Sequence, residues 1–484
     1  MRDLENAVFA IGHTPEALML QAGERMSQAI LRYYPSKKHA IAYLGKGHNA
    51  GDALVIAKQL QKAGWTIHLR CPYLKEDLSP LTLRMFQALG AIPLDSATAP
   101  APGYLLIDGL LGIGAEGPLR TPLKELTTEM NEARDSIDCT LVSLDNPSGV
   151  NASTGEIYPG AVKADHTLCV GYPKAGLLKS SCTHYVGALT QITLDALKDH
   201  APEVNHASPQ LITPHSLRRL RRDFDTHKGQ AGRIGIWAGS EGMLGAAVLT
   251  ATAALRSGSG LITLFTPPAL YPILAPMLPP EIMVQPSSSP LTMLKHNFDA
   301  LVLGPGIGSP AADLAVQLLG VAEKSTIPTV LDADMLNLIS RENKQSALHS
   351  KCILTPHPGE MKRLFPSSHS RENMARSFCE SCPVTLLLKG ARTIITDPNS
   401  PLYINSSGTP AMATAGQGDV LSGLIGGLCA QGYSQLDACK LAAWLAGEAA
   451  QLALASQTET EETLTASSVL SFLPQAFLAV PRQA

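Results

Sequence analysis

Hydrophobic and polar positions follow one repeated rhythm along this chain. Short apolar runs rich in β-branched residues alternate with longer amphipathic stretches, and several runs end in glycine or aspartate. Such runs predict buried strands, the stretches between them predict covering helices, and the alternation is typical of parallel sheets. In the first half the predicted strands are 39–44, 66–71, 104–111, 140–145, 166–171 and 189–194. In the second half they are 233–238, 261–266, 300–303, 329–332, 352–354, 384–388 and 393–396.

A polar segment with two prolines, residues 198–209, separates the two sets of strands. Domain boundaries fall in segments of this composition. We therefore predict two α/β domains, residues 1–205 and residues 206–484. No short-period repeat interrupts either half, so a solenoid is not expected.

Composition and charge narrow the classes of partner. The chain has 484 residues, with 38 basic against 41 acidic side chains, a net charge of −3 and no long run of either sign. Neither nucleic acid nor an anionic membrane is expected as a partner. The nine cysteines are odd in number and scattered, which favours a reducing compartment. The N-terminus has no basic region leading into an apolar core, and no window of about twenty residues is apolar throughout. We expect a soluble cytoplasmic protein.

The segment 411–423 carries the most specific chemistry in the second half. Gly416 and Gly418 lack the Cβ atoms that would keep a phosphate away, so backbone N–H groups and the helix dipole can face an anion. Asp419 follows them directly and is suited to take the proton of an attacking hydroxyl during phosphoryl transfer. The alternative is a glycine-led start to a buried helix, because the residues that follow are small and apolar.

In the first half, three predicted strand ends carry polar groups. They lie in the segments 45–52, 107–120 and 143–150. In a parallel sheet these ends share one edge, where ligands bind. Asn49, Asp108 and Ser148 would supply three oxygens for a hard cation, and Asp145 is left as a candidate acid or base. The alternative is that Asp108 and Asp145 only cap loops.

Several motifs occur together in an order that resembles one enzyme family. In the first half they are 15–23, the glycine-rich turn, the Asp108 loop, 144–150 and 171–177; in the second they are 304–308, 331–337, 355–361, 388–393 and the segment around Asp419. The chain resembles the bifunctional NAD(P)H-hydrate repair enzymes, in which an NAD(P)HX epimerase domain is fused to an ADP/ATP-dependent NAD(P)HX dehydratase domain. The resemblance implies a Rossmann-like parallel sheet with flanking helices, followed by a ribokinase-like α/β domain.

For the second half the resemblance implies repair of NADHX and NADPHX, whose nicotinamide ring carries an added hydroxyl at C6. Asp419 would take the proton of that hydroxyl as its oxygen attacks the terminal phosphate of ADP or ATP, which is bound with Mg2+. The implied nucleotide-binding residues are Lys389, Gly390, Ala391, Arg392, Thr393 and Gly418. The implied contacts to the hydrate are Ala253, Gly306, His357 and Asp419. Taken alone, His357 between two prolines could equally shape a turn.

For the first half the resemblance implies interconversion of the R and S hydrates. Asn49, Asp108 and Ser148 would hold a potassium ion, and Asp145 would act at the substrate. The implied substrate-binding loops are His48, Asn49, Ala50, Gly51 and Asp52, and Gly112, Ile113, Gly114, Ala115, Glu116, Gly117 and Pro118. A homo-oligomer is expected.

The chain departs from the family pattern in three segments. The family commonly has Asn-Asn-Gly-Gly-Asp-Gly where this chain has the segment 48–53, so Ala50 narrows the loop and His48 replaces an amide. Asn146 stands in place of an aliphatic residue. Gln417 replaces Thr or Ser but keeps its backbone N–H, so the anion-binding turn should survive.

Two other functions remain open from the sequence. A ribokinase-like kinase for a small alcohol would share the glycine–aspartate site, and a dehydratase could carry a first half that binds without catalysing. The motif 355–360 with the attached first domain argues against the kinase, and the joint presence of Asp108, Asp145 and Ser148 argues against the silent module. The preference for ADP or ATP, and for NADHX or NADPHX, is not predicted.

Overall fold

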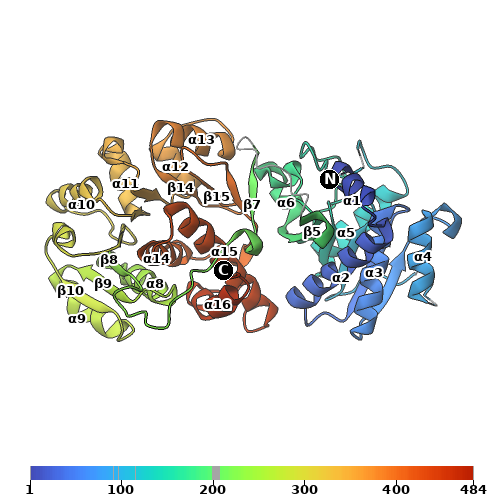
Figure 1. Cartoon of the computed structure of the whole chain (residues 1–484), viewed down its shortest axis with the longest axis horizontal. Helices are drawn as coiled ribbons and strands as arrows, with labels where there is room; N and C mark the ends of the chain where they lie inside the picture. Colours follow the sequence, from blue (N-terminus) through green and yellow to red (C-terminus); the bar gives the residue numbers. More distant parts are fainter. Residues whose placement is uncertain (1, 91, 96, 115, 199–207, 483–484) are drawn as a thin grey trace. The chain divides into compact units, whose positions relative to one another are not determined.

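The computed structural model describes residues 2–90, 92–95, 97–114, 116–198 and 208–482. Contacts between Cα atoms divide the chain into two compact units, Met1–Asn205 and His206–Ala484, called unit 1 and unit 2 below (Figure 1). Each unit has its own sheet and its own hydrophobic core. The predicted class, two α/β domains, is confirmed.

Unit 1 is built on a six-stranded sheet in which every neighbouring pair of strands is parallel. In spatial order the strands are β2 (Thr66–Arg70), β1 (His39–Leu44), β3 (Leu105–Gly109), β4 (Thr140–Leu144), β5 (His166–Val170) and β6 (Ala188–Ile192). The strand order reverses at β1. The connection that follows β1 leads to β2 on one side, and the connection that follows β3 leads to β4 on the other side. In a doubly wound sheet, ligands bind at such a switch point, beyond the carboxyl ends of the strands.

Helices cover both faces of this sheet. They are α1 (Arg2–Ala10), α2 (Pro15–Tyr33), α3 (His48–Lys62), α4 (Pro80–Leu89), α5 (Leu123–Ile137), α6 (Thr183–Val186) and α7 (Asp195–Lys198). Alternate residues of β1 show the two-sided burial: Ala40, Ala42 and Leu44 join the core with α2, α3 and α4, whereas Ile41 and Tyr43 pack with α5. Strands buried on both faces read as continuous apolar runs, which explains why they were predictable.

Unit 2 has a ten-stranded mixed sheet. In spatial order the strands are β10 (Met283–Pro286), β9 (Leu261–Thr266), β8 (Arg233–Trp237), β11 (Ala300–Leu303), β12 (Thr329–Leu331), β13 (Cys352–Leu354), β14 (Thr385–Leu388), β15 (Ile394–Thr396), β16 (Tyr403–Asn405) and β7 (Gln210–Ile212). The strand β15 is antiparallel to both its neighbours, and all other pairs are parallel.

Helices flank the sheet of unit 2 (Figure 1). They are α8 (Leu244–Arg256), α9 (Tyr271–Leu274), α10 (Ala312–Lys324), α11 (Asp334–Arg341), α12 (Pro358–Leu364), α13 (Arg371–Ser381), α14 (Gln417–Ala430), α15 (Gln435–Ala455) and α16 (Ala466–Leu478). The apolar helix α14 packs against α8, α15 and β11 and lies at the centre of the core. The helix α15 contributes Trp444 to that core, 3% exposed, so its apolar face is internal.

Both ends of unit 2 are held by backbone hydrogen bonds. The first strand, β7, pairs with β16 at the sheet edge. Near the other end, the Arg219 N–H donates to Pro481 O at 2.9 Å, and Arg219 and Arg482 form a parallel β-bridge. The segment that enters the unit is therefore bound to the segment that ends it.

No helix among the described residues is long and apolar enough to cross a membrane. All nine cysteines are free thiols.

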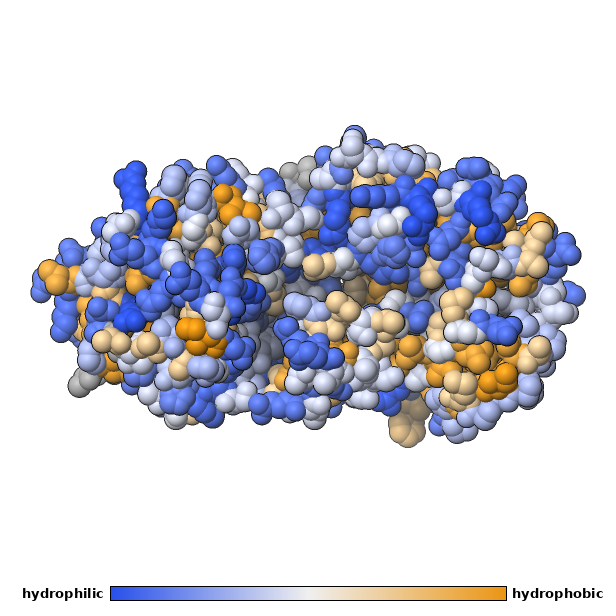
Figure 2. Space-filling view, turned by 180° about the vertical axis from the view of Figure 1, so that it is seen from behind, coloured by the Kyte–Doolittle hydropathy of each residue, from blue (hydrophilic) through white to orange (hydrophobic). Residues whose placement is uncertain are grey.

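Apolar residues gather at one end of unit 2, where Figure 2 shows a patch near α9 and β10. The exposed members are Tyr271, Ile273, Met277 and Met283.

Candidate active sites

The helix α14 begins with the turn that the sequence singled out. Gly416 has φ +89°, and a Cβ there would lie 2.6 Å from Leu249 Cδ1, so both the backbone angle and the space require glycine. Asp419 lies in the first turn of the helix. The backbone N–H groups of this turn have no partner within the helix, so they are available to an anion.

A buried network of charges lies beside this turn. Asp332, at the end of β12, is 1% exposed and accepts hydrogen bonds from Lys389 Nζ at 2.8 Å and Ser422 Oγ at 2.7 Å. Lys389 Nζ is also 3.9 Å from Glu360 Oε2. A Cβ placed on Gly418 would lie 3.3 Å from Lys389 Nζ. The glycine thus leaves open the approach to the lysine ammonium group, which is where a phosphate would bind.

This network sets the protonation of Asp419. Burial raises its pKa from 3.8 to about 6, the negative charges of Asp332 and Asp334 add to the effect, and Lys389 opposes it. Such a carboxylate is mostly ionised at neutral pH yet basic enough to accept a proton. For Lys389, burial alone would lower the pKa, but the carboxylates of Asp332 and Glu360 raise it, so the ammonium group stays charged.

Two further turns border this network. His357 precedes α12. Its ring Nδ1 accepts from the Gly359 N–H at 2.9 Å, and its backbone N–H donates to Glu360 Oε2 at 2.8 Å. With half of its side chain exposed, His357 both shapes the turn and presents an imidazole edge to solvent. On the β11 side, Gly306 has φ +61°, and the Gly308 N–H donates to Asp334 Oδ2 at 2.8 Å.

The segment 389–393 is organised by an arginine that the sequence did not single out. Arg371 donates to the backbone oxygens of Leu388 at 3.4 Å, Lys389 at 3.1 Å and Arg392 at 3.3 Å. A Cβ on Gly390 would lie 2.5 Å from the Arg371 guanidinium, and Thr393 closes the turn by donating to Gly390 O. A cavity of about 210 Å3 borders this segment and includes Arg371 and Leu388 in its wall.

Not every predicted residue reaches this place. Ala253 is fully buried between α8 and α14, with its Cβ 2.8 Å from the position that a Cβ of Gly423 would take, so no atom of it is open to a ligand in this conformation. Arg392 is also buried, at 2% exposure, whereas Gly390 and Ala391 are exposed.

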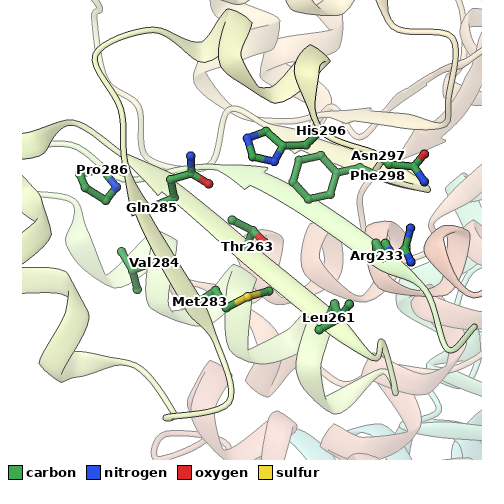
Figure 3. Close-up of a pocket in the computed structure, with 10 residues that line it drawn as sticks. All are labelled: Arg233, Leu261, Thr263, Met283, Val284, Gln285, Pro286, His296, Asn297 and Phe298. Atoms are coloured by element: carbon green, nitrogen blue, oxygen red, sulfur yellow. The ribbon is translucent and has the colours of Figure 1, made fainter. Parts of the chain in front are cut away.

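A cavity of about 470 Å3 lies on the face of β8, β9 and β10 (Figure 3). Its wall combines Leu261 and Thr263 of β9 with His296 and Phe298 from the segment before β11. None of the predicted site residues lines it. The residues predicted to carry the chemistry of unit 2 lie in and around the charged network at the strand ends and not in this cavity.

In unit 1, Asp108 is the centre of a hydrogen-bond network. It is fully buried at the end of β3. Its Oδ1 accepts from Leu110 N at 3.2 Å and Ser148 Oγ at 2.7 Å, and its Oδ2 accepts from Ser143 Oγ and Ser148 N, both at 2.9 Å. Burial raises the pKa of Asp108, and the four hydrogen bonds oppose that effect.

The structure brings the three predicted cation ligands to one loop. The Leu111 N–H donates to Ser148 Oγ at 3.0 Å, and Asn49 Nδ2 donates to Leu111 O at 3.0 Å. Oxygen atoms of this kind suit a hard cation. Among the described residues, no donor contacts the Asn49 side-chain oxygen, and Ser148 Oγ keeps one lone pair, whereas four donors fill the Asp108 carboxylate. Direct ligation by Asp108 therefore requires one donor to turn away. Among the described residues, no group of three histidine, cysteine, aspartate or glutamate side chains could hold a metal ion.

Asp145 combines an uncommon backbone conformation with a carboxylate bound by a buried lysine. It follows β4 with φ +62°, in the left-handed region that non-glycine residues seldom adopt. Its Oδ1 accepts from Lys174 Nζ and from the Val170 N–H at 3.1 Å. The Lys174 ammonium group also donates to Val170 O at 2.8 Å and contacts Cys169 Sγ at 3.4 Å. Although burial opposes it, the Asp145 charge raises the pKa of Lys174, so the lysine stays protonated.

The residues of the two predicted substrate loops differ in exposure. His48 is exposed at the start of α3, and Ala50 and Gly51 are buried within it. Asp52 is partly buried, and its pKa is raised well above the ordinary range, first by burial and then by the charge of Asp145. In the second loop, Gly114, Glu116 and Pro118 are exposed, Gly112, Ile113 and Gly117 are partly buried, and Ala115 lies outside the described residues.

Comparison with known proteins decides the family. A family described as "NAD(P)H-hydrate dehydratase" matches residues 234–474, and one described as "YjeF-related protein N-terminus" matches residues 15–176. The bifunctional NAD(P)H-hydrate repair enzyme Nnr of Gloeobacter violaceus is 36% identical over 454 residues, which are 89% of this chain and 88% of that protein. The chain belongs to the bifunctional NAD(P)H-hydrate repair enzyme family.

Solved structures match unit 2. A ribokinase-like superfamily protein from Enterococcus faecalis, 22% identical, covers 58% of this chain and 99% of its own, with a TM-score of 0.50, which supports the ribokinase-like fold. An ADP/ATP-dependent NAD(P)H-hydrate dehydratase from Bacillus subtilis, crystallised with ATP and Mg2+, is 28% identical over 54% of this chain and 94% of its own, with a TM-score of 0.46.

Four residues of this repair-enzyme family member were not assigned a role from the sequence: Asp332, Glu360, Arg371 and Lys174. The strand-end rule that selected Asp108 also applies to Asp332, which directly follows β12. Glu360 and Lys174 stood inside matched motifs, at 355–361 and 171–177. Arg371 had no comparable signal, because it acts on a loop that lies about twenty residues further along the chain.

The departures from the family pattern have structural counterparts. Asn146 is buried, and its side-chain amide donates to Val150 O at 2.7 Å. The amide therefore fills the place of an aliphatic side chain and stabilises the loop 146–150 by a hydrogen bond. The Gln417 amide is inaccessible to water, and within the described part of the chain it has no hydrogen-bond partner. Its backbone remains in the first turn of α14.

Proposed function

We propose that this chain repairs hydrated nicotinamide coenzymes with both units. Unit 1 interconverts R- and S-NAD(P)HX, and unit 2 dehydrates S-NAD(P)HX to NAD(P)H, converting ADP to AMP and phosphate. The observation that carries the proposal for unit 2 is the Asp419 carboxylate, with its pKa near 6, beside the Lys389 ammonium group in a chain of this family.

In unit 2, the repair begins by making a poor leaving group into a good one. Asp419 takes the C6 hydroxyl proton as the oxygen attacks the terminal phosphate of the nucleotide. Lys389 and the backbone N–H groups of Gly416 to Gly418 stabilise the negative charge that develops. The lone pair of the ring nitrogen then expels phosphate from C6, and loss of a C5 proton restores the reduced nicotinamide.

The same site accounts for the nucleotide. Lys389, Gly390, Ala391, Arg392 and Thr393 form the segment that Arg371 holds, and we place the adenine nucleotide along it, with its phosphates toward Gly418. Bound Mg2+ would supply charge neutralisation for these phosphates. For the hydrate, Gly306 and His357 are the proposed contacts beside Asp419. Ala253 would contact it only if α8 moved away from α14.

In unit 1, Asp145 is the proposed acid or base, and the segments 48–52 and 112–118 are the proposed substrate loops. Potassium would be held by oxygens of Asn49 and Ser148, with Asp108 supplying the balancing charge and, after a change of hydrogen bonding, a ligand. Its chemistry would be structural: it would fix the loop 110–111 against the start of α3.

One assay tests both activities. Mixed R and S hydrate is incubated with ADP or with ATP and Mg2+, and the absorbance of the reduced nicotinamide is followed. Asp419→Ala should abolish recovery from either epimer. Asp145→Ala should leave the S form convertible and slow consumption of the R form to the spontaneous rate. Asp313→Ala is the matched control, because Asp313 is an exposed acidic residue in the first turn of α10.

Two results would reject the proposal. Equal recovery by wild type and Asp419→Ala would remove the base. Identical kinetics for the R form in wild type and Asp145→Ala would favour a silent first unit. A stable phosphate ester in the phosphorus NMR spectrum, without recovered NAD(P)H, would favour the small-alcohol kinase.

We also infer a cytoplasmic homo-oligomer. The nine free thiols support a reducing compartment such as the cytoplasm. The exposed patch of Tyr271, Ile273, Met277 and Met283 is the proposed contact between copies, because apolar patches of this kind mark association sites. Light scattering after size-exclusion chromatography should give a multiple of 51.2 kDa for wild type and a smaller mass for Ile273→Lys.

A further inference from the structure

The cavity on β8, β9 and β10 is floored by a sheet face whose central residues are small. Side chains alternate along a strand, so Ile234 and Ile262 belong to the core of unit 2, whereas their neighbours in the chain point to the opposite face. In the middle of that face Gly235 pairs with Thr263. A Cβ on Gly235 would lie 2.8 Å from Phe298 Cδ2, so the glycine lets this ring lie directly on the strands. The hollow that remains has a volume of about 470 Å3, within the range of ligand-binding pockets.

Three polar side chains of the wall have no hydrogen-bond or ion-pair partner within the part of the chain that the structure describes. Thr263 is 9% exposed, and no donor or acceptor meets its hydroxyl group. The same holds for the Gln285 amide on β10 and for the Arg233 guanidinium group on β8. A hydroxyl group that is withdrawn from water without a partner costs free energy, so a ligand that supplies the partner is favoured.

Two stacked rings from the segment before β11 form another wall. The centroids of His296 and Phe298 are 5.4 Å apart with 25° between the ring planes, and both rings meet buried Phe265, at 5.5 Å and 5.8 Å. Figure 3 shows the two rings beside the strands of the floor. Leu261 and Met283 add apolar surface. Aromatic and apolar groups arranged in this way suit a planar ring.

The polar groups lie toward two ends of the floor. Arg233 pairs with Leu261 where β8 and β9 begin, and Gln285 pairs with Phe265, four residues further along β9. At about 3.3 Å per residue these positions are about 13 Å apart along the strands, and both long side chains shorten that span. No carboxylate of the described residues lines the cavity, since Asp299, which accepts from the Arg233 backbone N–H at 2.8 Å, is not part of the wall. A ligand that reached both ends would carry a hydrogen-bonding edge and an anionic group.

We propose that this cavity binds a mononucleotide, a heteroaromatic base joined through ribose to a phosphate group. The base lies against His296 and Phe298, its edge is hydrogen-bonded by Gln285 and Thr263, and Arg233 binds the phosphate. AMP, which the proposed reaction of unit 2 forms, and nicotinamide mononucleotide, one half of the coenzymes, both have this chemistry. None of the residues proposed for catalysis lines the cavity, so the site goes beyond the repair reaction and does not depend on it.

Calorimetry on the whole chain tests this site. AMP, nicotinamide mononucleotide, adenosine and inorganic phosphate are titrated separately. At least one of the two mononucleotides should bind, and the one that binds more tightly identifies the source of the base. Adenosine should bind about tenfold more weakly than AMP, because it lacks the phosphate for Arg233, and inorganic phosphate alone should bind more weakly still.

Two variants remove single contacts of the proposed ligand. Thr263→Val keeps nearly the same shape and deletes a hydroxyl group that has no partner in the described chain, so the melting temperature should not fall, whereas mononucleotide affinity should fall about fivefold. Arg233→Gln should weaken mononucleotide binding about tenfold or more and leave adenosine binding unchanged. Arg256→Gln, an exposed residue in the last turn of α8 and outside the cavity, is the matched control and should change neither.

The remaining outcomes separate this cavity from other sites. Gly418→Ala alters the proposed catalytic turn and should keep AMP binding at the cavity. AMP binding that disappears in Gly418→Ala and persists in Thr263→Val would overturn the proposal. So would the failure of both mononucleotides to bind at millimolar concentration. A mass by light scattering that falls in Arg233→Gln would also overturn it, because the face would then be a contact between copies. A failed repair assay with intact mononucleotide binding would reject only the proposed function.

Discussion

Replacing Asp419 by Asn should stabilise unit 2 while abolishing dehydration. The folded protein holds this carboxyl at a pKa of about 6 instead of 3.8, so the folded state binds the proton more tightly than the unfolded chain does. The resulting destabilisation is absent below pH 3.8, grows as the pH rises through about 6, and is complete above it. At about 1.4 kcal/mol for each pH unit, the full effect is about 3 kcal/mol, and partial exposure of the carboxylate reduces it to about 1–3 kcal/mol.

Asn is nearly isosteric with Asp and never ionises, so the variant escapes this cost. Urea unfolding can report on unit 2 alone if Trp65 is first replaced by Phe, because the remaining Trp237 and Trp444 are buried in unit 2, at 2% and 3% exposure. We expect Asp419→Asn to exceed its parent by about 1–3 kcal/mol at pH 7.5 and by about 0.5 kcal/mol or less at pH 4. A variant that is no more stable at pH 7.5, or that gains equally at both pH values, would refute the reasoning.

Three further outcomes follow from the two sites. The kcat/KM of dehydration should fall about tenfold per pH unit below the Asp419 pKa of about 6, because the base is then protonated, and a flat profile down to pH 5 would contradict this. Gly418→Ala puts a methyl group 3.3 Å from Lys389 Nζ, so calorimetry should show ADP binding weakened about tenfold or more with little change in melting temperature. Asp108→Asn turns an amide N–H toward buried donors. The free energy of unfolding of unit 1, measured in urea, should therefore fall by about 2–4 kcal/mol, and epimerase activity should be lost. An unchanged unfolding midpoint would show that the network is not needed.

Much of the fold was readable from the sequence because both sheets are buried on two faces. Each of the predicted apolar runs contains a strand, and several bounds agree to the residue, as for β1, β9 and β11. The three strands that were not predicted, β7, β10 and β16, each include a polar residue, Gln210, Gln285 and Asn405 in turn, which interrupts the apolar run. The direction of β15 was also hidden, because antiparallel pairing arises from a tight connection and leaves no mark on hydrophobicity.

The sites were less readable than the sheets. Strand-end position and glycine spacing selected Asp145 and Asp419, but which atoms meet depends on side chains that arrive from distant segments. Lys174 reaches Asp145 across 29 positions of sequence, and Lys389 reaches Asp332 across 57. The burial of Ala253 against α14 shows the converse: a residue can match a family position and still be closed to solvent in the folded chain.

The hydrogen bonds that join the entry and exit segments of unit 2 have a consequence for protein engineering. Since β7 completes the sheet, a fragment that begins after Ile212 would leave β16 as an unpaired edge strand, and one that begins after Arg219 would also lose the hydrogen bond to Pro481. A fragment retaining 208–482 keeps every such bond. The segments near its two ends already meet at Arg219 and Pro481, which makes this half a candidate for circular permutation.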